Sequence, residues 1–380
     1  MKKTYYLFVV LIVLLPVACF SGCGSGEEPW VSTGGSISNC QMVVLGLDSQ
    51  NGVLFAGGWS KGSTTKLSAG IGVWRYDGST WKSTAGAISS YSIYSLAYDS
   101  AHNLLYAGTS KDGSNTGVWK YDGATWADVS SSLSGKPVVC LLYDSERNVL
   151  YAGTDGGVWK YDGFTWVNTG GAVSGYQIAS LACDSAHNVL YAGTDSQGVW
   201  KYDGTTWTST KGAVSDRRIL SLSYDPEHRA LYAGTQEYGV WKYNGSAWTN
   251  TEGAVKDYLV SSLAYDSNHN LLYAASTYSG ANYQPGKANP LVWKYDGQAW
   301  TSDGGGLPSE AVYSLAYDSS HDVLYAGVHN GVWFKTSGKP NHSVQDDTRR
   351  YGTIPGGITA CTGQHKTIQD DTGQHELHRS

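Results

Sequence analysis

Two kinds of ionisable side chain recur at fixed places along this sequence of 380 residues. An Asp ends a short apolar run seven times, at Asp48, Asp99, Asp144, Asp184, Asp225, Asp266 and Asp318. Five of them are followed three residues later by a His, at His102, His187, His228, His269 and His321. Carboxylate and imidazole together suit metal binding or acid–base chemistry. Because copies of one repeat position lie on separate structural units and cannot converge on one ion, we expect these residues to form turns, and we predict no metal site.

The other reactive groups form no recognisable catalytic motif. Cys40, Cys140 and Cys183 fall at unequal repeat positions without a Cys-x-x-Cys spacing, which favours buried free thiols over zinc or redox chemistry, although an exported chain would permit a disulfide. The repeated Asp-Gly pairs differ from a sialidase Asp box, in which one residue separates Asp from Gly. The sequence shows no nucleophile elbow, paired-carboxylate signature or phosphate loop. We therefore predict a protein that is not an enzyme and that needs no cofactor.

One repeat position varies in chemistry while its neighbours are nearly constant. Eight residues before the seven Asp, the chain has Cys40, Tyr91, Lys136, Tyr176, Arg217, Tyr258 and Glu310. Surface Tyr, Arg and Lys suit carbohydrate or peptide binding, by stacking and polar contacts. We predict ligand-binding roles for Tyr91, Lys136, Tyr176, Arg217, Tyr258 and Glu310, and for Trp59, which the repeat pattern does not explain. Ordinary variation of loop residues is the alternative explanation.

These positions belong to one repeated unit. The seven Asp lie 51, 45, 40, 41, 41 and 52 residues apart. Each is followed by a turn, an apolar strand, a Val-Trp strand, an Asp-Gly or Asn-Gly pair and, in six units, a second Trp. The Val-Trp residues are Trp74, Trp119, Trp159, Trp200, Trp241, Trp293 and Trp333, and the second Trp are Trp81, Trp126, Trp166, Trp207, Trp248 and Trp300. Four short strands at this period predict an all-β fold, a seven-bladed β-propeller of four-stranded blades, over residues 30–335.

The missing seventh copy of the second Trp lies at the other end of the repeat region. The segment Trp30-Val-Ser-Thr-Gly-Gly35 matches Trp166-Val-Asn-Thr-Gly-Gly171. We therefore expect the N-terminal strand to pair with the strand around Trp333 and to complete the last blade, which leaves no open sheet edge. Both Trp of each blade should then be structural and mostly buried.

The turns and loops carry further expectations. The Asp-Gly pairs predict two-residue type I′ hairpins. The first turn of each unit ends on Asn103, Asn148, Asn188, Asn270 or Gly52, which suit a left-handed backbone, and on the less suitable Arg229 and Asp322. The loops that carry the variable position should open on the same face as the loops between second and third strands. Two of the latter are enlarged, over residues 58–72 and 276–290, and carry Trp59, Tyr278 and Tyr283.

Composition excludes several classes of protein. With 48 Gly, 15 Trp and only 15% charged residues, the chain does not have the composition of a helical bundle. A formal net charge of −6 argues against a nucleic-acid partner.

The N-terminus has the pattern of an export signal. Lys2 and Lys3 precede an apolar run over residues 5–15, too short to span a membrane. Phe20-Ser21-Gly22-Cys23 resembles a bacterial lipobox, which implies a lipid-modified Cys23; Cys19 is a second candidate, and an ordinary cleaved signal is the alternative. We predict a signal peptide over residues 1–22, a tether over 23–29 and a cell-envelope protein lipid-anchored on the outer membrane or cell surface. The polar residues 336–380 should form a disordered tail.

The stretch Thr154-Asp-Gly-Gly-Val-Trp-Lys-Tyr-Asp-Gly163 resembles the repeat of bacterial two-component-regulator-type sensor propellers, and its Tyr-Asp-Gly-x-x-Trp part is similar to kelch repeats. The resemblance covers residues 30–335 and implies the propeller fold. We predict a non-catalytic, monomeric binding, scaffold or sensor-like module that takes a protein or glycan partner through one propeller face. The alternatives are a lectin-like glycan binder and a glycan-active enzyme of sialidase or lyase type.

Overall fold

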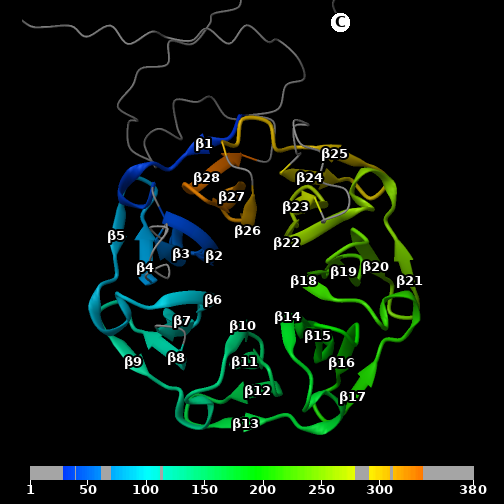
Figure 1. The fold of residues 1–380 in the computed structure, drawn as a ribbon, viewed down its shortest axis with the longest axis horizontal. Coiled ribbons are helices and arrows are strands. Elements are labelled where there is room, and N and C mark those ends of the chain that lie inside the picture. Colours follow the sequence, from blue (N-terminus) through cyan, green and yellow to red (C-terminus); the bar gives the residue numbers. More distant parts are fainter. Residues whose placement is uncertain are drawn as a thin grey trace, which may run out of the picture.

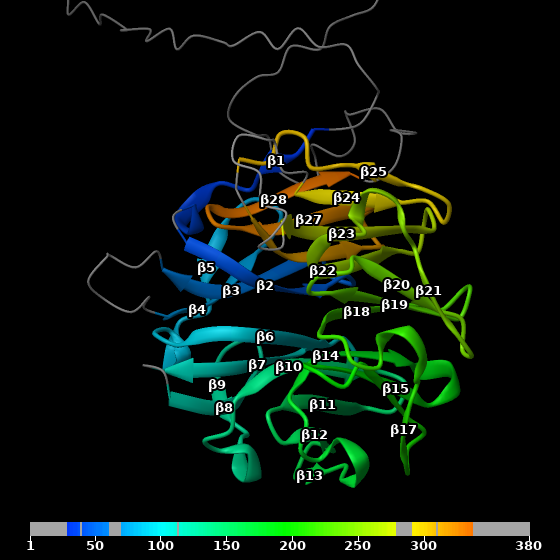
Figure 2. The same ribbon diagram turned by 45° about the vertical axis from the view of Figure 1, so that its right-hand side comes forward.

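Seven four-stranded antiparallel sheets form a closed ring (Figure 1; Figure 2). The computed structural model describes residues 29–38, 40–60, 70–111, 114–278, 291–308 and 311–336. The innermost strand of each sheet faces the axis of the ring, and the fourth strand lies at the rim (Figure 1). The seven-bladed, all-β propeller predicted from the repeats is therefore confirmed.

Blade 1 consists of β2 (Cys40–Asp48), β3 (Val53–Ser60), β4 (Gly70–Tyr76) and β5 (Trp81–Ser83). Blade 2 consists of β6 (Ser92–Asp99), β7 (Leu104–Lys111), β8 (Ser114–Tyr121) and β9 (Trp126–Asp128). Blade 3 consists of β10 (Val138–Asp144), β11 (Val149–Thr154), β12 (Gly157–Tyr161) and β13 (Trp166–Asn168). Blade 4 consists of β14 (Ile178–Asp184), β15 (Val189–Thr194), β16 (Val199–Tyr202) and β17 (Trp207–Ser209).

Blade 5 consists of β18 (Ile219–Asp225), β19 (Ala230–Thr235), β20 (Val240–Tyr243) and β21 (Trp248–Asn250). Blade 6 consists of β22 (Tyr258–Asp266), β23 (Leu271–Tyr278), β24 (Val292–Tyr295) and β25 (Trp300–Ser302). Blade 7 consists of β26 (Val312–Asp318), β27 (Val323–Val328), β28 (Gly331–Thr336) and the N-terminal β1 (Val31–Ser32).

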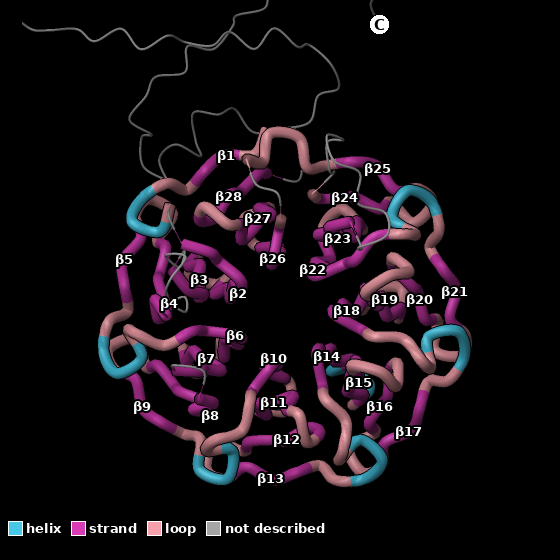
Figure 3. Tube along the Cα trace, in the orientation of Figure 1, coloured by secondary structure: helices cyan, strands magenta, loops and turns pink. Residues whose placement is uncertain are grey.

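Single 3-10 turns sit at the rim, between the outermost strand of one blade and the innermost strand of the next (Figure 3). They are η1 (Gly35–Ile37), η2 (Gly86–Ile88), η3 (Ser131–Leu133), η4 (Gly171–Val173), η6 (Gly212–Val214) and η7 (Gly253–Val255); η5 (Ser185–His187) lies instead in the first turn of blade 4. Each rim turn buries its last apolar residue, for example Ile37 and Val173. The chain is thereby fixed where it crosses from one blade to the next.

The blades pack by setting a bulky residue against a small one. On the innermost strands, the Leu three residues before the repeated Asp is mostly buried, and the residue that follows this Leu is usually Ala or Gly. A Cβ at Gly46 would lie 3.1 Å from the Cβ of Leu96 in the next blade. The small residue therefore leaves the room that the neighbouring Leu needs.

Blade 7 closes the ring as the sequence predicts. Val31 of β1 pairs with Phe334 of β28, and Ser32 pairs with Trp333. The side chain of Trp30 is only 5% exposed, and its indole N–H donates to the carbonyl of Asp303 in blade 6 at 2.7 Å. The N-terminal strand is thus bound to the last blade and to the blade before it.

The hairpins between third and fourth strands differ from the expected type I′ turn. Tyr76 pairs with Trp81, so the loop has four residues, and Gly78 has a positive φ of 88° while Asp77 does not. The Asp77 carboxylate instead accepts the backbone N–H groups of Ser79 (3.1 Å) and Thr80 (2.8 Å). The prediction of a two-residue turn was wrong because the Asp caps the loop through its side chain rather than through a left-handed backbone.

The two Trp sets differ in burial. The fourth-strand Trp, from Trp30 to Trp300, are 4–8% exposed, as predicted. Of the third-strand Trp, however, only Trp293 is buried, and Trp74, Trp119, Trp159, Trp200, Trp241 and Trp333 are half-buried. The prediction that both sets are mostly buried is therefore confirmed, although the third-strand Trp keep more exposed surface than the fourth-strand Trp.

Candidate functional site

The loops that carry the variable position share one face with the hairpins between second and third strands. The N–H of Gly72, at the start of the third strand of blade 1, donates to the carbonyl of Tyr91 at 3.0 Å. The same bond joins Gly157 to Tyr176 (3.0 Å) and Gly239 to Tyr258 (3.2 Å). We call this face, defined by the loops that lead into the innermost strands, the entry face.

Each variable side chain with a described ring or cation contact covers the third-strand Trp of its own blade. Ring centroids lie 5.8 Å apart in the pairs Tyr91–Trp119, Tyr176–Trp200 and Tyr258–Trp293. The Lys136 Nζ lies 5.7 Å from the ring of Trp159. These variable side chains are half-buried. Because each belongs to a different blade, they are spread around the entry face. Glu310, Tyr283 and Cys23 lie outside the described residues.

Arg217 makes the most extensive of these contacts. Its guanidinium lies 3.6 Å from the ring centre of Tyr238 and 5.3 Å from that of Trp241, and its Nε donates to the carbonyl of Ala213 at 2.7 Å. Tyr238 is 46% exposed. Arg218 beside it donates to the Gln236 amide oxygen at 3.0 Å and lines, with Arg217 and Tyr238, a hollow of about 210 Å³. This part of the entry face combines an aromatic ring with charges of both signs, since Asp216 and Glu237 line the same hollow and Arg218 pairs with Asp195.

A second aromatic pair on this face consists of Trp59, which was predicted from the sequence, and Tyr94, which was not. Trp59 extends β3 beyond the length of most of its counterparts, and its ring centroid lies 5.9 Å from that of Tyr94 on β6. Tyr94 is 49% exposed and sits at a β-bulge, where the pairing of β6 with β7 shifts between Ile93 and Ser95. All seven innermost strands have this bulge, and its residue varies from Ala179 to Tyr94. Sequence reasoning missed Tyr94 because an extra residue in a strand reverses which side chains face outward.

The repeated Asp and His lie at the opposite face, which we call the turn face. Each of the five His Nδ1 atoms lies 2.8–3.0 Å from a carboxylate oxygen of the Asp three residues before it. These pairs are the turn-forming contacts expected from the sequence. A Tyr of the following blade also reaches the Asp: Tyr98 donates to Asp48 at 2.7 Å and Tyr224 donates to Asp184 at 2.5 Å, and Tyr143, Tyr265 and Tyr317 contact the equivalent Asp of the blade before them. The carboxylates therefore join neighbouring blades.

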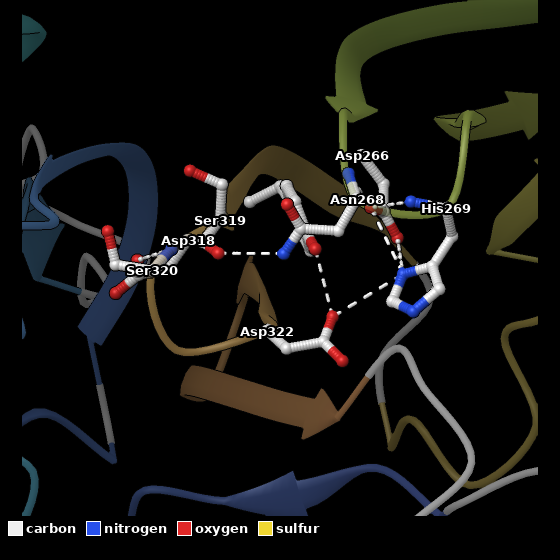
Figure 4. A network of polar contacts seen from close by, with 8 residues as sticks. Asp266, Asn268, His269, Asp318, Ser319, Ser320 and Asp322 are labelled. Carbon is white, nitrogen blue, oxygen red and sulfur yellow. Dashed lines mark hydrogen bonds and ion pairs between the residues drawn. The ribbon is translucent and has the colours of Figure 1, made fainter.

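One junction gathers an additional carboxylate (Figure 4). His269 Nδ1 lies 3.0 Å from Asp266 of blade 6 and 3.5 Å from Asp322 of blade 7, and the ligand atoms of these three residues lie within 4.8 Å of one another. Asp322 occupies the left-handed turn position, at φ 56°, where four other blades have Asn. Its carboxylate accepts the hydroxyl of Tyr317 at 2.9 Å. Each of these three side chains therefore already has a hydrogen-bond or ion-pair partner within the protein, which explains their close approach without a metal ion.

The cysteines do not have the character of nucleophiles. Cys40, Cys140 and Cys183 are free thiols. Burial raises the pKa of Cys140 to about 12, and it also raises the pKa of Cys40 and of Cys183. A thiolate is the reactive form of Cys, so a raised pKa lowers the reactivity of these side chains at neutral pH.

Comparison with known proteins shows the fold. No protein-family model matches the sequence, and no curated protein sequence matches it. Two structures of the extracellular domain of BT4673, a one component or hybrid two component system from B. thetaiotaomicron, align over 81% of this chain with a TM-score of 0.61 and 18% and 17% identity. A GH74 xyloglucanase from Xanthomonas campestris aligns over 81% at a TM-score of 0.60 and 16% identity, and YCF48 bound to D1 peptide aligns over 83% at 0.60 and 12%.

The chain matches only part of some of these proteins. It covers 40% and 39% of the two BT4673 chains and 53% of the xyloglucanase, but 99% of YCF48. The propeller therefore occurs both as a part of larger proteins and as nearly a whole chain. Among the described residues, no helix is long and apolar enough to cross a membrane.

Proposed function

We propose that this propeller is a non-catalytic binding module that takes a partner protein or a glycan through its entry face. The observation that carries the proposal is the variable position. The residues on either side of it are nearly constant from blade to blade, but its own side chain changes, and in each of these blades it lies over the third-strand Trp. A packing role alone would favour one residue type at every copy. BT4673 and YCF48, which share the fold, are an extracellular domain and a peptide-bound protein.

The third-strand Trp beneath these side chains add to the argument. Within the described part of the chain, the indole N–H groups of Trp119, Trp159 and Trp241 are buried and lack a hydrogen-bond partner. An unpaired buried donor costs about 1–3 kcal/mol. A ligand that displaces the covering side chain could accept a hydrogen bond from the indole N–H and stack on the Trp ring. Both contacts would favour binding at the entry face.

The experiment is a binding screen followed by paired variants. The purified chain is screened on a glycan array and against envelope proteins by cross-linking, and each hit is measured again with the double variant Tyr176→Ala and Arg217→Ala. We expect binding to fall by at least about tenfold, which corresponds to 1.4 kcal/mol. The control is Lys242→Ala, which removes a comparable cation–π contact with Tyr232, at 5.5 Å, from another part of the repeat. Hits that bind the double variant and the control equally well would contradict the proposal.

A lectin-like function is the second candidate, and the Trp59–Tyr94 pair favours it. Exposed aromatic rings provide flat surfaces on which sugar rings stack, and Tyr94 is 49% exposed. In that case the screen yields glycans, and Trp59→Ala with Tyr94→Ala abolishes their binding. A glycan-active enzyme would instead release product from such hits, and the loss of release on replacing Glu310 would support it.

We further propose that the chain is exported and anchored through a lipid on Cys23, as a monomer. The support is the sequence pattern of residues 1–23. Cys23→Ser should move the protein from the membrane fraction to the soluble fraction, because the acyl chains are the proposed hydrophobic attachment. Mass spectrometry of the mature N-terminus decides the point: an unmodified terminus elsewhere would refute the anchor.

A further inference from the structure

A cavity lies on the turn face, between blades 1 and 2. It has a volume of about 480 Å³, within the range of small-ligand sites. The wall from blade 1 is the cross-strand pair Phe55–Arg75, and the wall from blade 2 is the cross-strand row Tyr98–Leu105–Tyr121. Both walls are regular sheet, so the cavity is a fixed part of the fold.

The next junction shows why this cavity is wide. The equivalent space between blades 2 and 3 measures about 230 Å³. There His102 stands where blade 1 has Asn51, Leu104 where it has Val53, and Tyr106 where it has Phe55. Three smaller side chains in blade 1 therefore widen the first cavity, and Phe164 of blade 3, where blade 2 has Ala124, also narrows the second. Asn51 still holds the turn, because its side chain donates to Asp48 at 2.8 Å as His102 pairs with Asp99.

The cavity has one cation that the protein does not neutralise by contact. Within the described part of the chain, the guanidinium of Arg75 has no hydrogen-bond or ion-pair partner, whereas the nearby Lys82 pairs with Asp77 at 3.5 Å. The Asp48 carboxylate at the inner end already accepts bonds from Asn51 and from the Tyr98 hydroxyl. The cavity therefore holds one acid and one base: the oxygens of Asp48 are occupied by hydrogen bonds, whereas the N–H donors of Arg75, on β4 of the blade 1 wall, remain open to a ligand.

The chemistry of these groups selects a ligand class. A guanidinium presents paired N–H donors that match both oxygens of a carboxylate. The half-buried rings of Tyr98 and Tyr121 offer apolar surface for the body of the ligand. We propose that the cavity between blades 1 and 2 binds a small organic carboxylate, the size of a uronic acid or an aromatic acid, with the carboxylate on Arg75.

The test is calorimetric titration of the purified full chain with four probes. D-Glucuronate and benzoate carry the carboxylate, and D-glucose and benzyl alcohol are their neutral counterparts. We expect at least one carboxylate to bind with a Kd of about 1 mM or lower and its neutral counterpart to bind at least about tenfold more weakly. Comparison of the two acids distinguishes a sugar acid from an aromatic acid. Failure of both acids to bind at 10 mM (about ten times the expected Kd) would overturn the proposal.

Two variants and one control locate the site. Arg75→Gln should weaken the bound acid by at least about tenfold, and Asn51→His should block it by filling the cavity with the residue that five other blades use. Lys120→Gln, the equivalent of Arg75 in the next junction, should leave binding unchanged. Melting curves show whether each variant is folded; if Asn51→His does not fold, Arg75→Gln decides alone. Unchanged affinity in Arg75→Gln would overturn the proposal.

The proposed carboxylate site and the proposed partner-binding site can be tested independently. The cavity is on the turn face, and the variable side chains are on the entry face. Tyr176→Ala with Arg217→Ala should therefore not alter carboxylate binding.

Discussion

Most fourth-strand Trp are held at both ends of the side chain. The ring stacks on a third-strand Tyr of the same blade, as in Tyr202–Trp207 at 4.9 Å. The indole N–H of five of them donates to a Thr of the preceding blade, as in Trp248 to Thr210 at 3.0 Å, whereas Trp30 and Trp166 donate to backbone carbonyls. The Thr hydroxyl in turn donates to a backbone carbonyl, that of Val199 at 2.8 Å. One residue thus links two blades through bonds buried from water.

Thr210→Val tests this link. The methyl that replaces the hydroxyl leaves the Trp248 indole N–H buried without an acceptor, so we expect a loss of about 1–3 kcal/mol in the free energy of unfolding, measured by denaturant titration. Thr208→Val is the matched control, because Thr208 is exposed on β17, two residues before Thr210. Equal stability of the two variants would show that the indole bond contributes nothing.

The acidic side chains make stability depend on pH. Backbone N–H groups of Thr125 and Ala124 lower the pKa of Asp122. At Asp184, burial acts to raise the pKa, but hydrogen bonds from Tyr224 and His187 outweigh it and the pKa is lowered. A carboxyl whose folded-state pKa is below its ordinary value of 3.8 adds stability above that pH and loses it as pH falls.

We therefore expect the free energy of unfolding to be level near neutral pH and to decrease from about pH 4 downward. Asp122→Asn should keep its turn, because Asn244 accepts the same two backbone bonds at 3.0 and 2.9 Å in blade 5. The variant removes one titrating group and should show a shallower decrease. Urea titrations from pH 7 to pH 2.5 provide the measurement, and a flat profile for the unmodified protein would contradict the assignment.

At the scale of elements, the hairpins between third and fourth strands depend on one glycine each. Gly163 has a φ of 98°, and a Cβ there would meet nothing within 4 Å. The space around Gly163 would accept a side chain, but the backbone conformation disfavours one. The cost of a substitution is therefore purely conformational.

Gly163→Ala should reduce the free energy of unfolding by about 1–2 kcal/mol. Gly175→Ala provides the control, because Gly175 also has open space around it but no positive φ. That variant should be neutral or stabilise by up to about 1 kcal/mol through the lower entropy of the unfolded chain. The same change in both would mean that backbone conformation does not decide the outcome.

At the scale of the whole molecule, stability depends on joining the two ends of the repeat region. At the closing junction, Lys335 replaces the usual third-strand Tyr and Asp303 replaces the usual Thr, and the two form a buried ion pair. The Lys335 Nζ lies 5.8 Å from the ring of Trp30. A buried ion pair is costly unless both partners stay in place, so this junction is sensitive to loss of the N-terminal strand.

A chain that begins at residue 37 should aggregate or melt well below a chain that begins at residue 29, because β28 would have an open edge. Within the longer chain, Trp30→Ala should cost about 3–5 kcal/mol. Differential scanning calorimetry and light scattering measure the two effects. A shorter chain that melts like the longer one would show that β1 is dispensable.

The sequence alone determined those features of the fold that recur in every copy of the repeat. Seven copies of one unit, and the match between Trp30 and Trp166, are enough to predict the number of blades and the closing strand. The left-handed turn positions were also predictable, including the unexpected residues Arg229 and Asp322, since both adopt positive φ. Each of these depends on residues that are close in sequence or on a comparison of copies.

The tertiary structure decided what depends on the neighbouring blade. The half-burial of the third-strand Trp, the exposure of Tyr94 and the cavity beside Arg75 all arise where side chains of two blades meet. The bulge at Tyr94 alters the facing of one residue without altering the repeat. The cavity is widened by modest reductions in size, at Asn51, Val53 and Phe55 and at Ala124 on the opposite wall, each inconspicuous by itself. Volume and exposure are properties of the space between elements, and the order of residues along a chain does not state them.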